Sequence, residues 1–188
     1  MKSANKISLL SYNELIQKIV KTNDPNLFAV LYDRYVNMVY NKCYGFATSK
    51  EEAQDLTHDV FIKLFVKLRT FKGTAKFSTW LYSFTYNFCV NYATRNNYKK
   101  NEKNFKGEIP DSNDLDYSDE SIYSMKSEKL KRALEIIDPT EKMILLLKYQ
   151  DDFSIKEIQD ALEIGESAVK MRLKRAKEKL ISVYKNLN

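Results

Sequence analysis

Residues 154–176 read SIKEIQDALEIGESAVKMRLKRA, and this stretch decides the fold of the C-terminal third of the chain. Ser154 and Glu157 have the spacing of a capping box, which predicts the start of a short helix of about eight residues. A turn at 163–165 contains a glycine, and a second helix is predicted from 166 to about 184. Two helices joined in this way indicate a helix-turn-helix.

The second helix of this motif is basic. Residues 170–188 carry seven basic residues and one acidic residue, Glu178. Apolar residues at helical spacing close a core between the two helices, which leaves the outer face of the second one free to enter a DNA major groove about 12 Å wide. The predicted contacts are Ser167, Ala168, Lys170, Met171, Arg172, Lys174 and Arg175. The alternative is a four-helix packing unit whose last helix is basic for solubility.

Two more helices are predicted ahead of this motif, over 127–137 and 140–149. The first ends before Asp138-Pro139, because proline restricts the backbone of the residue that precedes it. The C-terminal domain, residues 123–188, is therefore expected to be a four-helix unit that contains the helix-turn-helix. Residues 97–122 have few aliphatic and many polar side chains, and are interpreted as a flexible linker.

The N-terminal domain, residues 1–96, is predicted to be helical as well. Apolar residues recur at spacings of three and four over 9–20, 26–46, 51–68 and 77–95. Only four glycines and three prolines occur in 188 residues, too few for the turns of a many-stranded β fold. The fold class is therefore all-α, with two small helical domains joined by the linker.

The segment 77–95 carries seven aromatic residues, more than one core face accommodates. Trp80, Phe84 and Phe88 recur at four-residue intervals, so we predict that they are buried in the core. Tyr82 is expected on another face of the same helix.

Composition excludes several functional classes. Cys43, Cys89 and His58 are too few and too scattered for a Cys/His zinc site, so no metal or other cofactor is expected. The longest apolar stretch, 143–147, is far shorter than the ~20 residues of a membrane span. Residues 1–20 lack the continuous apolar stretch of a signal peptide, which predicts a cytoplasmic protein.

The chain as a whole resembles the extracytoplasmic-function (ECF) sigma factors of the sigma-70 family. The stretch EAQDLTHDVFIKLF at 52–65, the FKG at 71–73 and the FSTWLY at 77–82 look like their region 2. SIKEI at 154–158 and SAVKMRLKRA at 167–176 are similar to their region 4. No counterpart of region 3 is evident between the two. His58, Gln159 and Met171 depart from the residues common at those positions.

The resemblance implies that the helix of 52–65 docks on a coiled coil of the largest subunit of core RNA polymerase. The residues that it assigns to this contact are Glu52, Asp55, Leu56, Asp59, Phe61 and Ile62. Without the resemblance, the carboxylates of this helix suggest acid-base catalysis, a metal site or merely a solvated face. No second set of ligands converges on them, so catalysis is the weakest interpretation and no enzyme is expected.

The resemblance further implies that 71–87 captures the non-template strand of the promoter minus-10 element, while the helix-turn-helix binds the minus-35 element. Base stacking contributes ~1–3 kcal/mol per base, comparable with the cost of unstacking. The residues expected at the minus-10 strand are Phe71, Lys72, Lys76, Tyr82, Asn87 and Arg95.

The predicted function is thus a sigma factor whose partners are core RNA polymerase and promoter DNA, with no direct membrane insertion. The resemblance also allows an anti-sigma factor as a partner, which in many family members is membrane-associated. The alternative is a free-standing regulator that binds duplex DNA as a dimer through the helix-turn-helix.

Overall fold

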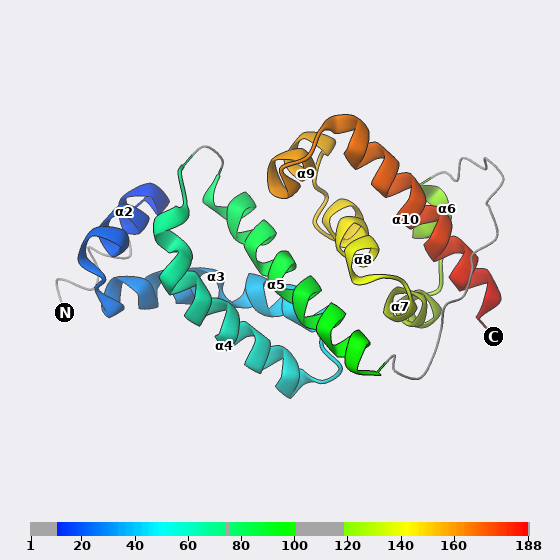
Figure 1. Ribbon diagram of the computed structural model, residues 1–188, viewed down its shortest axis with the longest axis horizontal. Helices are drawn as coiled ribbons and strands as arrows, with labels where there is room; N and C mark the ends of the chain where they lie inside the picture. Colours follow the sequence, from blue (N-terminus) through cyan, green and yellow to red (C-terminus); the bar gives the residue numbers. More distant parts are fainter. Residues whose placement is uncertain (1–10, 74–75, 101–118, 188) are drawn as a thin grey trace. The chain divides into compact units, whose positions relative to one another are not determined.

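The computed structural model describes residues 11–73, 76–100 and 119–187, with side chains except at 97–100. Within these ranges every regular element is a helix, which confirms the all-α prediction. The chain divides into two compact units at Asn91 and Tyr92, and Figure 1 shows the helices in sequence colours. This boundary falls within the helix of 77–100, which is described whole with the first unit.

Four α-helices lie in the described part of the first unit. They are α2 (Tyr12–Thr22), α3 (Pro25–Tyr44), α4 (Lys50–Lys67), which a 3₁₀ turn, η1 (Leu68–Thr70), continues, and α5 (Phe77–Lys100). Local side chains fix where these helices begin. The Ser49 hydroxyl accepts a bond from the Glu52 amide at 3.1 Å and so caps α4. Helix α5 continues beyond 96, into the segment predicted as linker.

The core of the first unit lies where α3, α4 and α5 pack together. Leu31 and Val39 of α3, and Val60 and Leu64 of α4, are fully buried. Helix α5 joins them through Tyr86, which is also fully buried and whose ring lies edge-on to that of Phe46. Leu81 and Cys89 of α5 are buried as well, so the packed side of this helix holds it in place together with the face described below.

The second unit contains α6 (Glu120–Tyr123), α7 (Ser127–Ile136), α8 (Pro139–Leu145) with a π-helical continuation η3 (Leu146–Gln150), α9 (Ile155–Leu162) and α10 (Glu166–Asn186). The four predicted helices correspond to α7, α8 with η3, α9 and α10. Helix α6 lies in the segment predicted as linker, yet Ile122 is buried and the Asp119 carboxylate bonds to Tyr149. The folded C-terminal unit therefore includes Asp119, earlier than the boundary predicted at 123.

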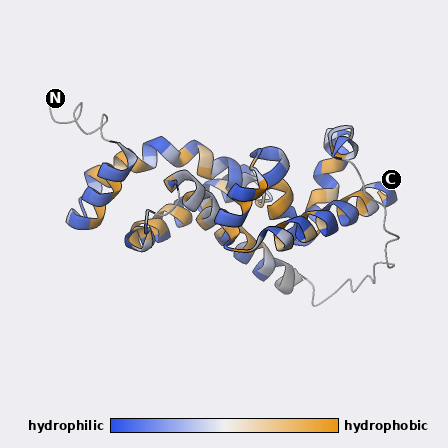
Figure 2. Cartoon of the chain, turned by 90° about the horizontal axis from the view of Figure 1, so that it is seen from above, coloured by the Kyte–Doolittle hydropathy of each residue, from blue (hydrophilic) through white to orange (hydrophobic). Residues whose placement is uncertain are grey.

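Helix α10 packs against α7, α8 and α9. Its buried residues Val169, Leu173, Ala176 and Leu180 recur every three to four positions. Figure 2 shows the long helices with orange and blue faces, the pattern expected of amphipathic helices around a core. None of the described helices combines the length and apolar character that a membrane span requires.

Candidate nucleic-acid and polymerase interfaces

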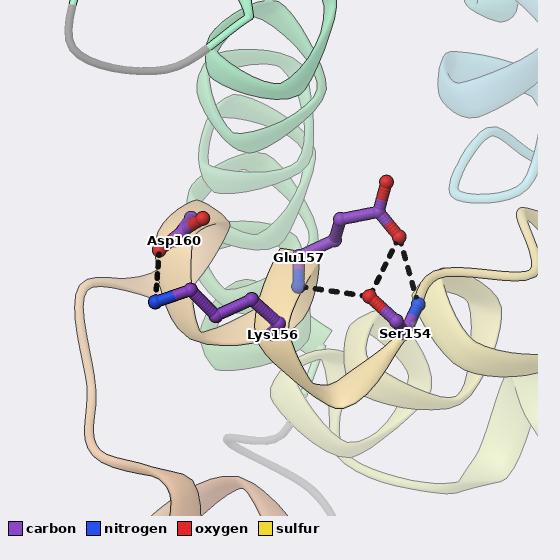
Figure 3. Close-up of polar contacts among 4 residues, drawn as sticks. All are labelled: Ser154, Lys156, Glu157 and Asp160. Carbon is purple, nitrogen blue, oxygen red and sulfur yellow. Dashed lines mark hydrogen bonds and ion pairs between the residues drawn. The ribbon is translucent and has the colours of Figure 1, made fainter.

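A reciprocal capping box fixes the start of the helix-turn-helix (Figure 3). The Ser154 hydroxyl accepts a bond from the Glu157 amide at 3.2 Å, and the Glu157 carboxylate accepts one from the Ser154 amide at 2.9 Å. The Lys156 ammonium lies 3.8 Å from Asp160 one turn on. Helix α9 therefore begins where the sequence predicted.

In the turn between α9 and α10, the residue with the left-handed backbone conformation is not the glycine. Glu163 has φ 54° and ends α9, whereas Gly165 has φ −71° and is the N-cap of α10. Glycine is accepted as an N-cap. Ile164, between them, is half-buried, and Val169 is fully buried.

Every residue predicted to contact the minus-35 element is exposed. These residues are Ser167, Ala168, Lys170, Met171, Arg172, Lys174 and Arg175. They alternate with the buried apolar positions of α10, so the helix presents one face to the core and another to solvent. The face is on a rigid helix, which is the geometry that groove insertion requires.

The basic side chains of α10 are not equivalent. Lys170 pairs with Glu166 at 2.6 Å, and the pKa of Glu166 is lowered first by that hydrogen bond. Lys177 and Lys179 are occupied inside the unit, by Asp119 at 3.0 Å and by Glu141 at 3.6 Å. Neither Arg172 nor Arg175 has an ion-pair partner among the described residues, and both are exposed. These two arginines are the uncommitted cations of the exposed face.

The cluster at Asp119 ties α6 to the rest of the second unit. The Tyr149 hydroxyl donates to the Asp119 carboxylate at 2.6 Å, and Lys177 donates to the same oxygen. The Tyr149 bond first, then Lys177, lowers the pKa of Asp119. Burial and the Asp119 charge raise the pKa of Tyr149, so the hydroxyl keeps its proton and remains a donor.

On α4, the residues predicted to bind polymerase fall into two groups. Asp55, Asp59 and Ile62 are exposed and follow one another at helical spacing. Val66, one turn beyond Ile62, extends this line. Ile62 is 66% exposed and Val66 64%, high values for large aliphatic side chains. We call Asp55, Asp59, Ile62 and Val66 the α4 stripe. Val66 is not among the residues predicted from the sequence, although its spacing from Ile62 indicated it.

The other residues of the predicted set serve the fold. Leu56 and Phe61 are each 3% exposed, and the Phe61 ring lies 4.5 Å from that of Tyr32 on α3. Both side chains are buried within the first unit, and their assignment to the polymerase contact stays a prediction. The Glu52 carboxylate accepts a bond from the Thr48 hydroxyl at 2.6 Å and so belongs to the start of α4.

Helix α5 presents a second exposed face, next to the chain reversal that follows α4. Lys76, Asn87 and Arg95 are exposed, while Trp80 and Phe84 are half-buried and stacked at 5.6 Å. The spacing of these residues puts them on one side of the helix. We call these five residues the α5 face. Trp80 and Phe84 are not in the buried core, so that prediction is wrong for both.

The remaining residues of the predicted minus-10 set lie around this face in different ways. Phe71 is half-buried, with its ring 5.4 Å from that of Trp80, and Lys72 is exposed beside it in the chain. Tyr82 instead lies on the side of α5 toward α3, where its ring is 5.3 Å from the Lys42 ammonium. Phe88, predicted as core, is half-buried with Lys63 over its ring at 4.6 Å.

Trp80 and Phe84 were predicted to be buried and are only half-buried, and this difference has a physical reason. Periodicity alone gives two candidate faces for a helix with this many rings, and only the position of α3 and α4 decides which is covered. The described residues contain no group of three His, Cys, Asp or Glu side chains placed to hold a metal ion.

Comparisons with known proteins agree with this arrangement. The model of sigma-70 region 2 matches residues 31–98, and that of sigma-70 region 4 matches residues 127–180. A search of curated protein sequences finds no match.

Two solved structures share the fold at low identity. The sigma factor RpoE, in complex with the anti-sigma factor NepR from Bartonella quintana, is 16% identical with a TM-score of 0.58. The match covers 86% of this chain and 98% of that one. CnrH, in complex with the cytosolic domain of CnrY, is 17% identical with a TM-score of 0.60, over 93% and 97% of the two chains.

Proposed function

The chain belongs to the sigma-70 family, with regions 2 and 4 in one polypeptide, and from this premise we propose how its two units act in transcription initiation. It is a promoter-directing sigma factor of the ECF type. The observation that carries the proposal is the presence of both regions in one chain, on the two units that bear the faces described above.

The second unit binds the minus-35 element. The exposed side of α10 enters the major groove, where Arg172 and Arg175 contact phosphates or guanine edges. Since both arginines are uncommitted within the described chain, their charge is available to DNA without breaking an internal ion pair. Met171, which directly precedes Arg172 and is 53% exposed, offers an apolar contact to a base edge.

The first unit captures the opened minus-10 strand on the α5 face. Trp80 and Phe84 form a stacked aromatic surface beside Phe71, and stacking on such surfaces contributes ~1–3 kcal/mol per base. Lys72, Lys76 and Arg95 supply positive charge for the phosphates, and Asn87 an amide for a base edge. Tyr82 acts from the α3 side, behind this surface.

The α4 stripe binds core RNA polymerase. It combines two carboxylates with two exposed aliphatic side chains, which suits a partner helix that is basic and partly apolar. Leu56, Phe61 and Glu52 support this helix from within.

Three further proposals follow from family membership. The protein works in the cytoplasm, where its polymerase and promoter are, and has no catalytic site or cofactor of its own. The linker, predicted over 97–122, is shorter than that, because α5 continues to Lys100 and the second unit includes Asp119. It joins the region 2 domain, predicted over 1–96, to the region 4 domain, predicted over 123–188. An anti-sigma factor regulates the protein, as the complexes of RpoE with NepR and of CnrH with a domain of CnrY suggest by analogy.

Run-off transcription tests the function. Purified protein is mixed with core RNA polymerase and candidate promoter fragments, and both co-migration with core and transcript formation are measured. We expect both. A protein that does not bind core RNA polymerase, and that binds a palindromic duplex as a dimer, would instead be a free-standing regulator.

A further inference from the structure

The interior of the first unit contains two free thiols that face each other. Cys43 of α3 and Cys89 of α5 have their sulfur atoms 3.8 Å apart, and both side chains are 0% exposed. These are the only two cysteines in the 188 residues. A cysteine buried alone is normally an inert small hydrophobe, so the pairing across two helices is what distinguishes this site.

The surroundings of the pair favour chemistry at Cys43. The Cys89 thiol donates a hydrogen bond to the Cys43 sulfur, while the Thr57 hydroxyl of α4 donates to the Ala53 carbonyl at 2.7 Å. The hydrogen bond from Cys89 is the largest influence on the pKa of the Cys43 thiol and lowers it, against the raising effect of burial. The thiolate is the reactive form of cysteine, and its partner for bond formation is already in contact.

We propose that Cys43 and Cys89 are a reversible oxidation site, at which a peroxide converts the two thiols to a disulfide that joins α3 to α5. The Cys43 thiolate attacks one oxygen of hydrogen peroxide, and the O–O bond breaks to leave a sulfenic acid and hydroxide, which takes up a proton as water. The Cys89 sulfur then attacks the Cys43 sulfur, and the S–O bond breaks to release water with the Cys89 proton. Two thiols and one peroxide give one disulfide and two waters.

Burial determines the kinetics of this reaction. Peroxide reaches Cys43 only when the packing of α3 and α5 opens locally, so the first step is slow. The second step is fast, because Cys89 is adjacent and intercepts the sulfenic acid before further oxidation. The sulfur atoms have to approach from 3.8 Å to the roughly 2.05 Å of a disulfide, a movement that side-chain rotation and a small helix shift supply.

The disulfide fastens the helix that carries the α5 face. It closes a loop of chain that includes α4, so the oxidised first unit resists unfolding more than the reduced one. Lys42 directly precedes Cys43, and Tyr86 lies three residues before Cys89. The Lys42 ammonium is 5.9 Å from the centre of the Tyr86 ring. The oxidation site thus lies directly behind the proposed minus-10 surface, although the chemistry does not depend on that proposed function.

The test uses the full-length, reduced protein and hydrogen peroxide. We expect a monomer that is 2 Da lighter, a fall from two titratable thiols to none under denaturing conditions, full reversal by dithiothreitol, and a rise of about 10 °C in the melting temperature of the first unit. Cys43→Ser and Cys89→Ser are matched controls that retain one thiol and cannot form the intramolecular bond.

Several outcomes would overturn the proposal. They are retention of two thiols, a mass gain of added oxygen in place of the 2 Da loss, disulfide-linked dimers only, or a disulfide that forms only after unfolding in urea. Each is read on the wild-type protein, so the result stands even where a serine variant fails to fold.

Discussion

The Lys177 ammonium of α10 lies 3.0 Å from the Asp119 carboxylate, and its side chain is only 16% exposed. One of the basic residues of the DNA-reading helix is therefore bound to its own unit and holds α6 in place. Proximity in sequence to Arg175 does not make Lys177 a DNA contact. This difference between neighbours on one helix provides the first test.

Arg175→Ala should weaken binding of the holoenzyme to a duplex minus-35 element and lower the slope of log affinity against log salt by about one. Lys177→Met is the matched control, because it removes one positive charge from the same helix at a position that faces inward. We expect it to leave the salt slope unchanged. Fluorescence anisotropy at several salt concentrations measures both, and equal slopes for Arg175→Ala and wild type would remove Arg175 from the interface.

Asp119→Asn should destabilise the second unit at neutral pH by about 1 kcal/mol or less, because the carboxylate is half exposed and its bonds are screened. The native-state pKa of Asp119 is lowered below its ordinary 3.8 by Tyr149 first and then by Lys177. The stabilisation is therefore present above about pH 4 and disappears as the pH falls through the lower native value. Hydrogen exchange of the α8 and α10 amides in wild type and in Asp119→Asn, at pH 7 and at pH 3, measures this stabilisation. An equal difference between the two proteins at both pH values would contradict the assignment.

Phe84→Ala should weaken binding of a single-stranded minus-10 oligonucleotide to the holoenzyme by about 1–3 kcal/mol, since one stacking surface is lost. Tyr82→Ala is the control, as it removes a ring from the other side of the same helix and should have a smaller effect on the strand. A larger loss of strand binding for Tyr82→Ala than for Phe84→Ala would restore Tyr82 as the principal contact.

Tyr86→Ala should instead cost about 3–5 kcal/mol of stability, because this ring is fully buried.

Asp55→Lys should reduce the affinity for core RNA polymerase at least tenfold, because it reverses one of the two negative charges of the α4 stripe. Asp33→Lys makes the same charge change at an exposed position of α3 outside the α4 stripe and should bind core normally. Circular dichroism checks that both variants remain folded. Normal core affinity for Asp55→Lys would mean that the carboxylates of α4 are only a solvated face.

The sequence by itself determined the helices and the motif. The capping pairs Ser49 with Glu52 and Ser154 with Glu157 act over three residues, so local sequence suffices to locate the starts of α4 and α9. The same holds for the stop at Asp138-Pro139 and for the apolar spacing of α10. Resemblance to the ECF sigma factors, carried by short motifs within such helices, was confirmed for the same reason.

Only the tertiary structure decided which side chains remain available. Whether Tyr82 or Phe84 faces outward depends on where α3 and α4 pack against α5, and whether Lys177 or Arg175 is free depends on Asp119, 58 residues before Lys177. The contact of Cys43 with Cys89 joins residues 46 positions apart in the chain. Burial and charge pairing are properties of neighbours in space, and a helical period specifies a face without specifying what covers it.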